Sequence, residues 1–166
     1  DLLVDVVSRN GNLLLNFPLP NNGMLDAEEL KILAEITKWM ATNDTAIYAT
    51  RPWKIYGVGP STQTTTADAK FNESKRKELT AEDVRFTTKG QTLYAFIMGR
   101  PQGQAVIAPL ATNGKHVTGK VRNVELLGYQ GKLQWTQDES GLKVQLPDEK
   151  PGSHAFAFKI DGLDLR

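Results

Sequence analysis

The stretch from Asp83 to Met98 constrains the fold of this chain more than any other. Val84 and Phe86 alternate with polar neighbours, which is the period-two pattern of a strand with one buried and one wet face. Gly90 then supplies a turn, because glycine adopts positive φ without strain. Residues 93–98 are apolar or aromatic at every position, which is typical of a strand packed on both faces. A hairpin of this kind predicts the centre of an antiparallel β-sandwich.

Further strand patterns surround this hairpin at the spacing of a sandwich. We expect short strands or extended segments at residues 46–48, 53–56, 104–110, 121–127, 133–135, 142–146 and 156–160. Residues 61–80 begin with Ser, Thr and Gln, continue with many charges, and are predicted to form a long loop. The sequence therefore indicates a fold that is mainly β.

The first fifty residues follow a different pattern. The apolar side chains of Asp1–Ser8 lie close together on a helical wheel and predict the end of a helix: they are Leu2, Leu3, Val6 and Val7. Leu13–Leu15 is a uniformly apolar run between turn signals, which predicts a strand buried on both faces. Ala27–Ala41 carries a broad apolar stripe and predicts a second helix. A helix–strand–helix unit belongs to an α/β fold, so we divide the chain into residues 1–52 and 53–166.

Composition excludes several classes of function. The chain has 166 residues with 20 Lys and Arg against 19 Asp and Glu, so it lacks the concentrated positive charge that nucleic acids and anionic membranes require. No apolar run reaches the ~18 residues of a membrane span. Because cysteine is absent, the chain has neither disulfides nor thiolate metal ligands.

Several residue types that often form sites have a simpler explanation here. His116 and His154 lie without a nearby carboxylate pattern, so we predict no metal site. Trp53 and Trp135 suit core or interdomain packing better than stacking on sugars. The motif at residues 57–59, Gly-Val-Gly, lacks the third glycine and the strand-to-helix context of a nucleotide-binding loop.

Two other patterns also give no strong indication of a functional site. The acidic residues Asp26, Glu28 and Glu29 lie at the start of the second predicted helix, where the helix dipole favours negative charge, so we do not interpret them as a catalytic pair. Asn43 and Asn72 each begin a glycosylation sequon, a pattern that also occurs by chance.

Two groups of sequence segments in the chain resemble a known family. The first reads Val-Asp-Val-Val-Ser-Arg-Asn-Gly-Asn-Leu-Leu-Leu-Asn at residues 4–16 and continues through Trp39 to residues 46–53. The second reads Thr-Ala-Glu-Asp-Val-Arg-Phe-Thr-Thr-Lys-Gly at residues 80–90 and continues at residues 93–95 and 124–128. Together they resemble the C-terminal part of the α-L-fucosidases of glycoside hydrolase family 29. Asn-Asp-Thr at residues 43–45 departs from the frequent Asn-Gly-Glu and alters only a turn.

The resemblance implies a fold and an activity for a longer enzyme. That family joins a (β/α)8-like catalytic barrel to a C-terminal β-sandwich, so Leu13–Leu15 would be the last barrel strand and Ala27–Ala41 the last barrel helix. The family cleaves terminal α-L-fucosyl groups from glycans with retention, using two carboxylates ~5–5.5 Å apart. Both belong to barrel parts upstream of this sequence, so no catalytic residue is assigned here, and no cofactor or metal is implied. The longer enzyme would be secreted, periplasmic or of lysosomal type.

Asn16 and Phe17 are the candidate substrate-binding residues. They follow the predicted barrel strand, and barrel active sites lie at the C-terminal ends of the strands. The ring of Phe17 would pack on the apolar face or the methyl group of the sugar. Alternatively, Phe17 packs within the loop between barrel strand and helix.

Two further interpretations stay open at this point. Besides the C-terminal part of a longer fucosidase, the chain could be an independent carbohydrate-binding or interaction module, or a fragment that completes a barrel supplied by a separate chain. In each case the apolar side chains of residues 2–7 and 13–15 need a cover. We expect that they are hidden by self-association, by swapping or by packing onto the sandwich.

Overall fold

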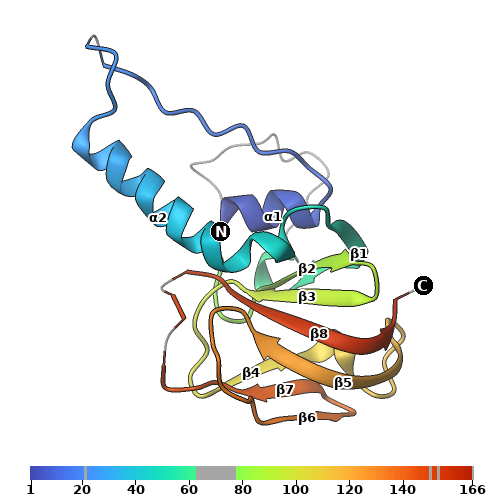
Figure 1. The fold of residues 1–166 in the computed structure, drawn as a ribbon. Coiled ribbons are helices and arrows are strands. Elements are labelled where there is room, and N and C mark those ends of the chain that lie inside the picture. The colour runs from blue at the N-terminus through green and yellow to red at the C-terminus, as the bar shows by residue number, and fades with distance from the viewer. Residues whose placement is uncertain (21, 63–77, 150, 153, 166) are drawn as a thin grey trace.

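The computed structural model describes residues 1–20, 22–62, 78–149, 151–152 and 154–165. Two helices lie over one face of a five-stranded sheet, and a three-stranded sheet lies against its other face (Figure 1). The elements in chain order are α1 (Leu2–Ser8), α2 (Ala27–Asn43), the 3-10 helix η1 (Asp44–Ala46), β1 (Arg51–Val58), η2 (Pro60–Thr62), β2 (Val84–Lys89), β3 (Thr92–Ile97), β4 (Gln104–Ile107), η4 (Ala108–Leu110), β5 (Thr118–Leu126), β6 (Trp135–Asp138), β7 (Gly141–Gln145) and β8 (Phe156–Asp164).

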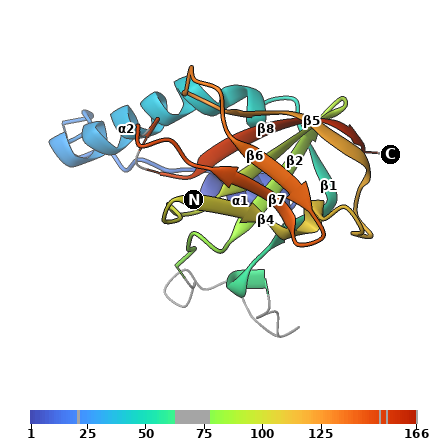
Figure 2. The same ribbon diagram turned by 90° about the horizontal axis from the view of Figure 1, so that it is seen from below.

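The strands form the predicted antiparallel β-sandwich. The larger sheet has the order β1-β2-β3-β8-β5 and the smaller sheet the order β4-β7-β6. Every pair of neighbouring strands is antiparallel. The smaller sheet crosses the larger one when the molecule is seen from below (Figure 2). The mainly β fold is therefore confirmed.

The hairpin of β2 and β3 lies at the centre of the larger sheet, as predicted. Its register runs from Val84 opposite Ile97 to Lys89 opposite Thr92. Gly90 makes the turn with a φ of 61°, a conformation that favours glycine. Strand β3 is packed on both faces. Its odd-numbered side chains from Leu93 contact the core between the sheets, and the even-numbered ones contact the layer of helices.

Two hydrophobic clusters hold the layers together. The larger lies between the sheets, and its fully buried members include Phe86, Leu93, Ile107, Leu142 and Phe158. The smaller lies between the larger sheet and the helices, and its members are Val4, Ala46, Ile47, Tyr94, Phe96, Met98, Ala155 and Ala157. The helical layer is thus part of the folded unit.

Strand β2 differs from the prediction in one respect. We expected Arg85 and Thr87 to face water, but both side chains have 0% exposure. Helix α1 lies against β1 and β2 and covers this face. The hydroxyl of Thr87 donates a hydrogen bond to the Ala46 carbonyl at 2.8 Å, so its polar group is satisfied inside the fold.

The predicted strand at Leu13–Leu15 is absent, and this expectation was wrong for the chain as it stands. Residues 11–20 form neither helix nor strand, and Leu14 is 93% exposed. Figure 1 shows this segment running past the helices, away from both sheets. A strand needs a neighbour to pair with its backbone N–H and C=O groups, and no described strand lies beside this run.

Residues 46–48 also differ from the prediction. Instead of extended chain they complete η1 and a turn, and Ala49 has a φ of 59°. A residue with positive φ breaks an extended segment, so the strand begins only at Arg51.

The predicted second helix is confirmed as α2, with a capping box at its start. The Glu29 backbone N–H donates to Asp26 Oδ1 at 2.9 Å, and the Asp26 N–H donates to Glu29 Oε2 at 3.4 Å. The acidic residues at 26–29 therefore include a helix cap, in agreement with the structural interpretation of this cluster.

Candidate functional site

An open apolar groove lies between α1, α2 and the segment that joins them. Its volume is about 520 Å³. Apolar side chains form most of its lining: they are Leu2, Leu3, Val4, Leu13, Leu15, Ile32, Ile36 and Trp39. Glu28, Lys31 and Glu35 add charges from α2. A concave apolar surface with a charged rim is suited to a protein partner or to a ligand with a large apolar face.

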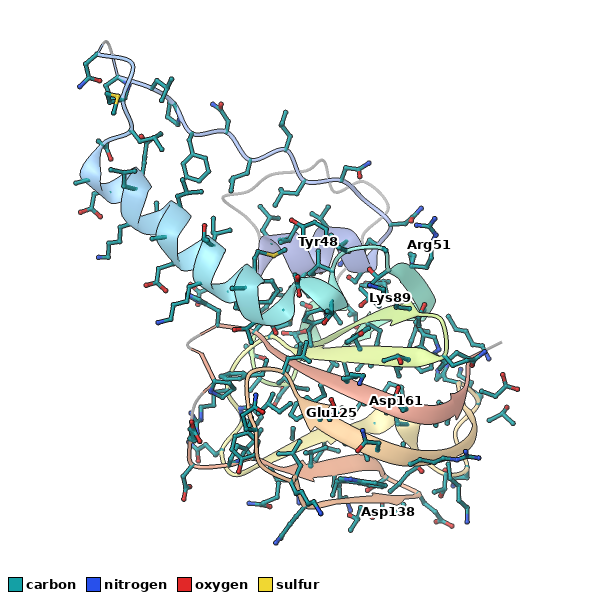
Figure 3. All side chains as sticks on the ribbon, viewed as in Figure 1. Tyr48, Arg51, Lys89, Glu125, Asp138 and Asp161 are labelled. Atoms are coloured by element: carbon teal, nitrogen blue, oxygen red, sulfur yellow. The ribbon has the colours of Figure 1, made fainter. Side chains whose placement is uncertain are left out.

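Helix α2 is attached to the sandwich near its C-terminal end. Trp39 Nε1 donates a hydrogen bond to the Ala155 carbonyl at 3.0 Å, and the indole lies 6.4 Å from the ring of Phe96. The N-terminal half of the helix projects beyond the sheets (Figure 3). Its side chains Leu30 and Ile32 are 53% and 52% exposed. This half of α2 consequently presents apolar surface without a covering layer among the described residues.

Helix α1 forms the other wall of the groove. Val4 is buried against the sandwich with 1% exposure, and Val7 packs against the same cluster. Leu2 and Leu3 are half-buried and line the groove. The apolar patch that we predicted for residues 2–7 is thus partly covered by packing onto the sandwich, one of the three expected outcomes. Leu14 and Leu15 are not covered in this way, because both are exposed.

Asn16 and Phe17 lie just beyond the groove in the irregular segment. Asn16 is exposed and Phe17 is half-buried, and neither belongs to the residues that line the groove. Their assignment to substrate binding stays a prediction. Sequence reasoning missed the contribution of Ile32 and Ile36 to this surface. The signal was present, because both isoleucines belong to the broad apolar stripe of α2, and only part of that stripe is covered by the sandwich.

The two histidines lie in separate places. His154 Nε2 lies 4.0 Å from Glu35 Oε2 beside the groove, and the His116 ring lies 6.2 Å from the ring of Trp53. Within the described ranges, no cluster of three or more His, Cys, Asp or Glu side chains has the arrangement of a metal site.

The tryptophans serve as core residues. Trp53 is 6% exposed and packs edge-on against Phe86 with ring centres 5.0 Å apart, so the packing interpretation is confirmed for this residue. Trp135 is half-buried and packs against the same cluster. Asn43, the first sequon residue, is 5% exposed and donates to the Trp39 carbonyl at 2.9 Å, so its amide is engaged inside the fold. Asn72 lies outside the described residues.

Among the residues that the structure describes, two carboxyl groups have clearly shifted pKa values, and both shifts are downward. Burial by itself raises the pKa of Asp83, but hydrogen bonds from Ser61 and Thr80 and the charge of Arg85 outweigh it and hold that pKa below its usual value. Hydrogen bonds from Lys143 and Ser140 lower the pKa of Asp138. A general acid for glycoside hydrolysis needs a raised pKa, so neither group suits that role.

The labelled charges in Figure 3 lie on the sandwich and outside the groove. Lys89 Nζ donates to the Tyr48 carbonyl at 3.3 Å, and Lys159 Nζ lies 3.4 Å from Glu125 and 3.9 Å from Asp161. These contacts are exposed or half-exposed ion pairs and hydrogen bonds, of the kind that stabilise a fold only slightly. In the part of the chain that the structure describes, no helix has the length and apolar character to cross a membrane.

Comparison with known proteins identifies the family. The profile described as alpha-L-fucosidase C-terminal domain matches residues 76–161, which is more than half of the chain. The chain belongs to the alpha-L-fucosidase C-terminal domain family. A second profile, described as alpha-L-fucosidase, matches residues 1–45, which include α1, the irregular segment and α2.

The relatives of this alpha-L-fucosidase C-terminal domain are about three times longer than the chain. Tissue alpha-L-fucosidase of Homo sapiens is 27% identical over 168 residues, which cover 97% of this chain and 30% of the relative. The Mus musculus tissue enzyme is 30% identical over 152 residues, which cover 90% of this chain and 28% of the relative. The Thermotoga maritima alpha-fucosidase, solved in complex with a mechanism-based inhibitor, has the same fold over 96% of this chain and 32% of its own length, with a TM-score of 0.68 and 23% identity.

Proposed function

We propose that this chain is the C-terminal part of a retaining α-L-fucosidase that removes terminal α-L-fucosyl groups from glycans. The observation that carries the proposal is the pair of consecutive profile matches, 1–45 and 76–161, in a chain that spans about 30% of its curated relatives. The catalytic carboxylates would lie in the part of the enzyme that this chain does not span. The substrate class follows from the names of the relatives and is carried over as part of the proposal.

Within that enzyme the chain supports the catalytic part. Residues 1–52 would be the end of the catalytic domain and residues 53–166 the C-terminal sandwich. The groove would contact the catalytic part, because its apolar lining and the exposed side chains of Leu14 and Leu15 need a cover. Asn16 and Phe17 follow those leucines, and we propose that they contact the fucosyl group or lie beside it. By itself the chain is inactive and, when the groove is not filled, associates through Leu2, Leu3 and the neighbouring apolar residues.

Reconstitution tests this proposal. The 166-residue chain is mixed with the remaining part of a tissue alpha-L-fucosidase, expressed separately, and hydrolysis of a nitrophenyl fucoside is measured. We expect hydrolysis from the mixture and none from the chain alone. The variant Ile32→Asp places a charge in the groove and should prevent reconstitution. Val106→Asp is the matched control, because Val106 is 47% exposed on β4 in the other sheet.

Other outcomes would refute specific parts of the proposal. Hydrolysis by the chain alone would contradict the absence of catalytic carboxylates from it. Saturable heat release during a titration of the chain with fucose would favour an independent carbohydrate-binding module. Equal reconstitution by Ile32→Asp and Val106→Asp would exclude the groove as the contact surface.

A further inference from the structure

A fully buried arginine connects the N-terminal helix to the sandwich. Arg85 on β2 has 0% exposure although its guanidinium is permanently charged. Its Nε donates to Asp5 Oδ1 on α1 at 2.6 Å, its Nη2 donates to Ser61 Oγ at 2.6 Å, and its Nη1 donates to the Val84 carbonyl at 3.1 Å. A buried charge without partners would be strongly unfavourable, so these contacts allow Arg85 to lie inside the fold.

The same contacts extend to the end of α1. Asp5 Oδ2 lies 3.4 Å from Nε of Arg9, the residue that follows the helix. The guanidinium carbon of Arg9 lies 4.0 Å from the centre of the Tyr56 ring, and that of Arg85 lies 5.6 Å from it. A ring on β1 is therefore close to both cations, at a distance at which the face of an aromatic ring attracts positive charge.

Asp83 fixes the other end of these contacts. Its carboxylate accepts hydrogen bonds from the backbone N–H groups of Ser61 at 2.9 Å and Thr80 at 3.0 Å. Ser61 is consequently bound through its backbone to Asp83 and through its hydroxyl to Arg85. We call Asp5, Ser61, Asp83 and Arg85 the Arg85 network.

Two glycines leave the space that the Arg85 network occupies. A Cβ atom on Gly57 would lie 2.8 Å from Arg85 Cδ and 2.5 Å from the Val84 carbonyl oxygen. A Cβ atom on Gly59 would lie 2.6 Å from Asp83 Oδ1. All three distances are too short for a side chain, so the glycines at 57 and 59 allow close packing against β2 and Asp83. The motif that resembled part of a nucleotide-binding loop has this structural explanation.

The Arg85 network crosses between the two parts that the family profiles match. Asp5 lies in the matched region 1–45, and Arg85 lies in the matched region 76–161. We propose that Arg85 is a positioning residue through which the sandwich fixes α1 and the start of the segment that leaves it at Arg9. The proposal concerns how the chain holds its own N-terminal part, so it goes beyond the proposed function and can be tested on the 166-residue chain.

Hydrogen exchange on the intact chain tests the proposal. The amides of Asp5, Arg9, Asn10 and Gly11 donate to carbonyls within α1 or at its end, so they report on local opening of this helix. In Asp5→Ala, which leaves a buried cation without its carboxylate, we expect these amides to exchange at least about tenfold faster than in the unmodified chain. The amides of β3 and β8 should change less than about threefold. Lys143→Met, which removes an exposed ion pair with Asp138, should leave α1 unchanged.

A double-mutant cycle separates positioning from general stability. Arg85→Met should open α1 less than Asp5→Ala does, because Asp5 is 16% exposed and keeps its contact with Arg9. The double variant has no buried cation left without a partner. The acceleration of amide exchange in α1 should therefore be at least about threefold smaller than the product of the accelerations in the two single variants. If Arg85→Met does not fold, Arg85→Gln replaces it, since glutamine also removes the charge and keeps a hydrogen-bond donor. Additive effects, or equal acceleration in α1, β3 and β8, would overturn the proposal.

Discussion

Trp39 should control whether α2 stays attached to the sandwich, and this expectation can be quantified. The indole donates to the Ala155 carbonyl at 3.0 Å and packs beside Phe96 in the cluster between the sheet and the helices. A half-buried indole removes about 100 Å² of apolar surface from water, worth about 2.5 kcal/mol at about 25 cal/mol per Å². The hydrogen bond adds about 1 kcal/mol. Trp39→Ala should therefore destabilise the docked helix by about 3.5 kcal/mol and Trp39→Phe by about 1 kcal/mol.

Hydrogen exchange is the suitable assay, because it reports detachment of α2 separately from unfolding of the sandwich. A helix of 17 residues is marginally stable in water by itself, so detachment exposes its amides to exchange. We expect the amides of the second half of α2 to exchange a few hundred-fold faster in Trp39→Ala and about fivefold faster in Trp39→Phe. The control is Trp135→Ala on β6, which should affect the smaller sheet and leave α2 unchanged. Equal effects of Trp39→Ala on α2 and β3, or no effect on α2, would refute the reasoning.

Three further predictions concern the sandwich, pH and the helix cap. Leu142→Ala removes a fully buried core side chain and should lower the free energy of unfolding by about 2–5 kcal/mol in urea denaturation; a loss below about 1 kcal/mol would contradict the packing described. The pKa of Asp83 is lower in the folded than in the unfolded chain, so its contribution is present above about pH 4 and is lost as the pH falls through the folded-state pKa. Asp83→Asn should accordingly show a smaller drop of the urea midpoint between pH 5 and pH 3, and an unchanged drop would exclude this role. Asp26→Ala should reduce the stability of docked α2 by about 1 kcal/mol, seen as faster exchange in its first turns, whereas Asp44→Ala at the other end serves as the control.

Most strands could be predicted from the sequence because their patterns are local. Alternation in residues 142–146 indicates a strand with one buried face, and the continuous apolar run at 93–98 indicates a strand buried on both faces. The structure shows β3 packed on both faces, as that run predicts. The turn at Gly90 and the capping box at Asp26 were recognisable for the same reason, since each depends on residues within a few positions.

The errors concern features that depend on distant parts of the molecule. Leu13–Leu15 has the composition of a buried strand, but composition specifies no pairing partner, and no described strand supplies one. Arg85 was assigned to the wet face of β2 because arginine is usually exposed, whereas α1 brings a carboxylate from 80 positions away in the chain. The two glycines at 57 and 59, only two positions apart, were the one feature of the sequence that could have indicated a bulky side chain packed closely against this segment.

The order of strands in the larger sheet has a consequence for synthesis of the protein. Strand β8, the last strand that the structure describes, lies between β3 and β5 and is hydrogen-bonded to both. When the chain leaves the ribosome from its N-terminus, β5 emerges before β8, its partner among the described strands of this sheet. The larger sheet is therefore completed only after residues 156–164 have been translated, and a nascent chain stopped shortly before them would display β5 as an unpaired edge open to aggregation.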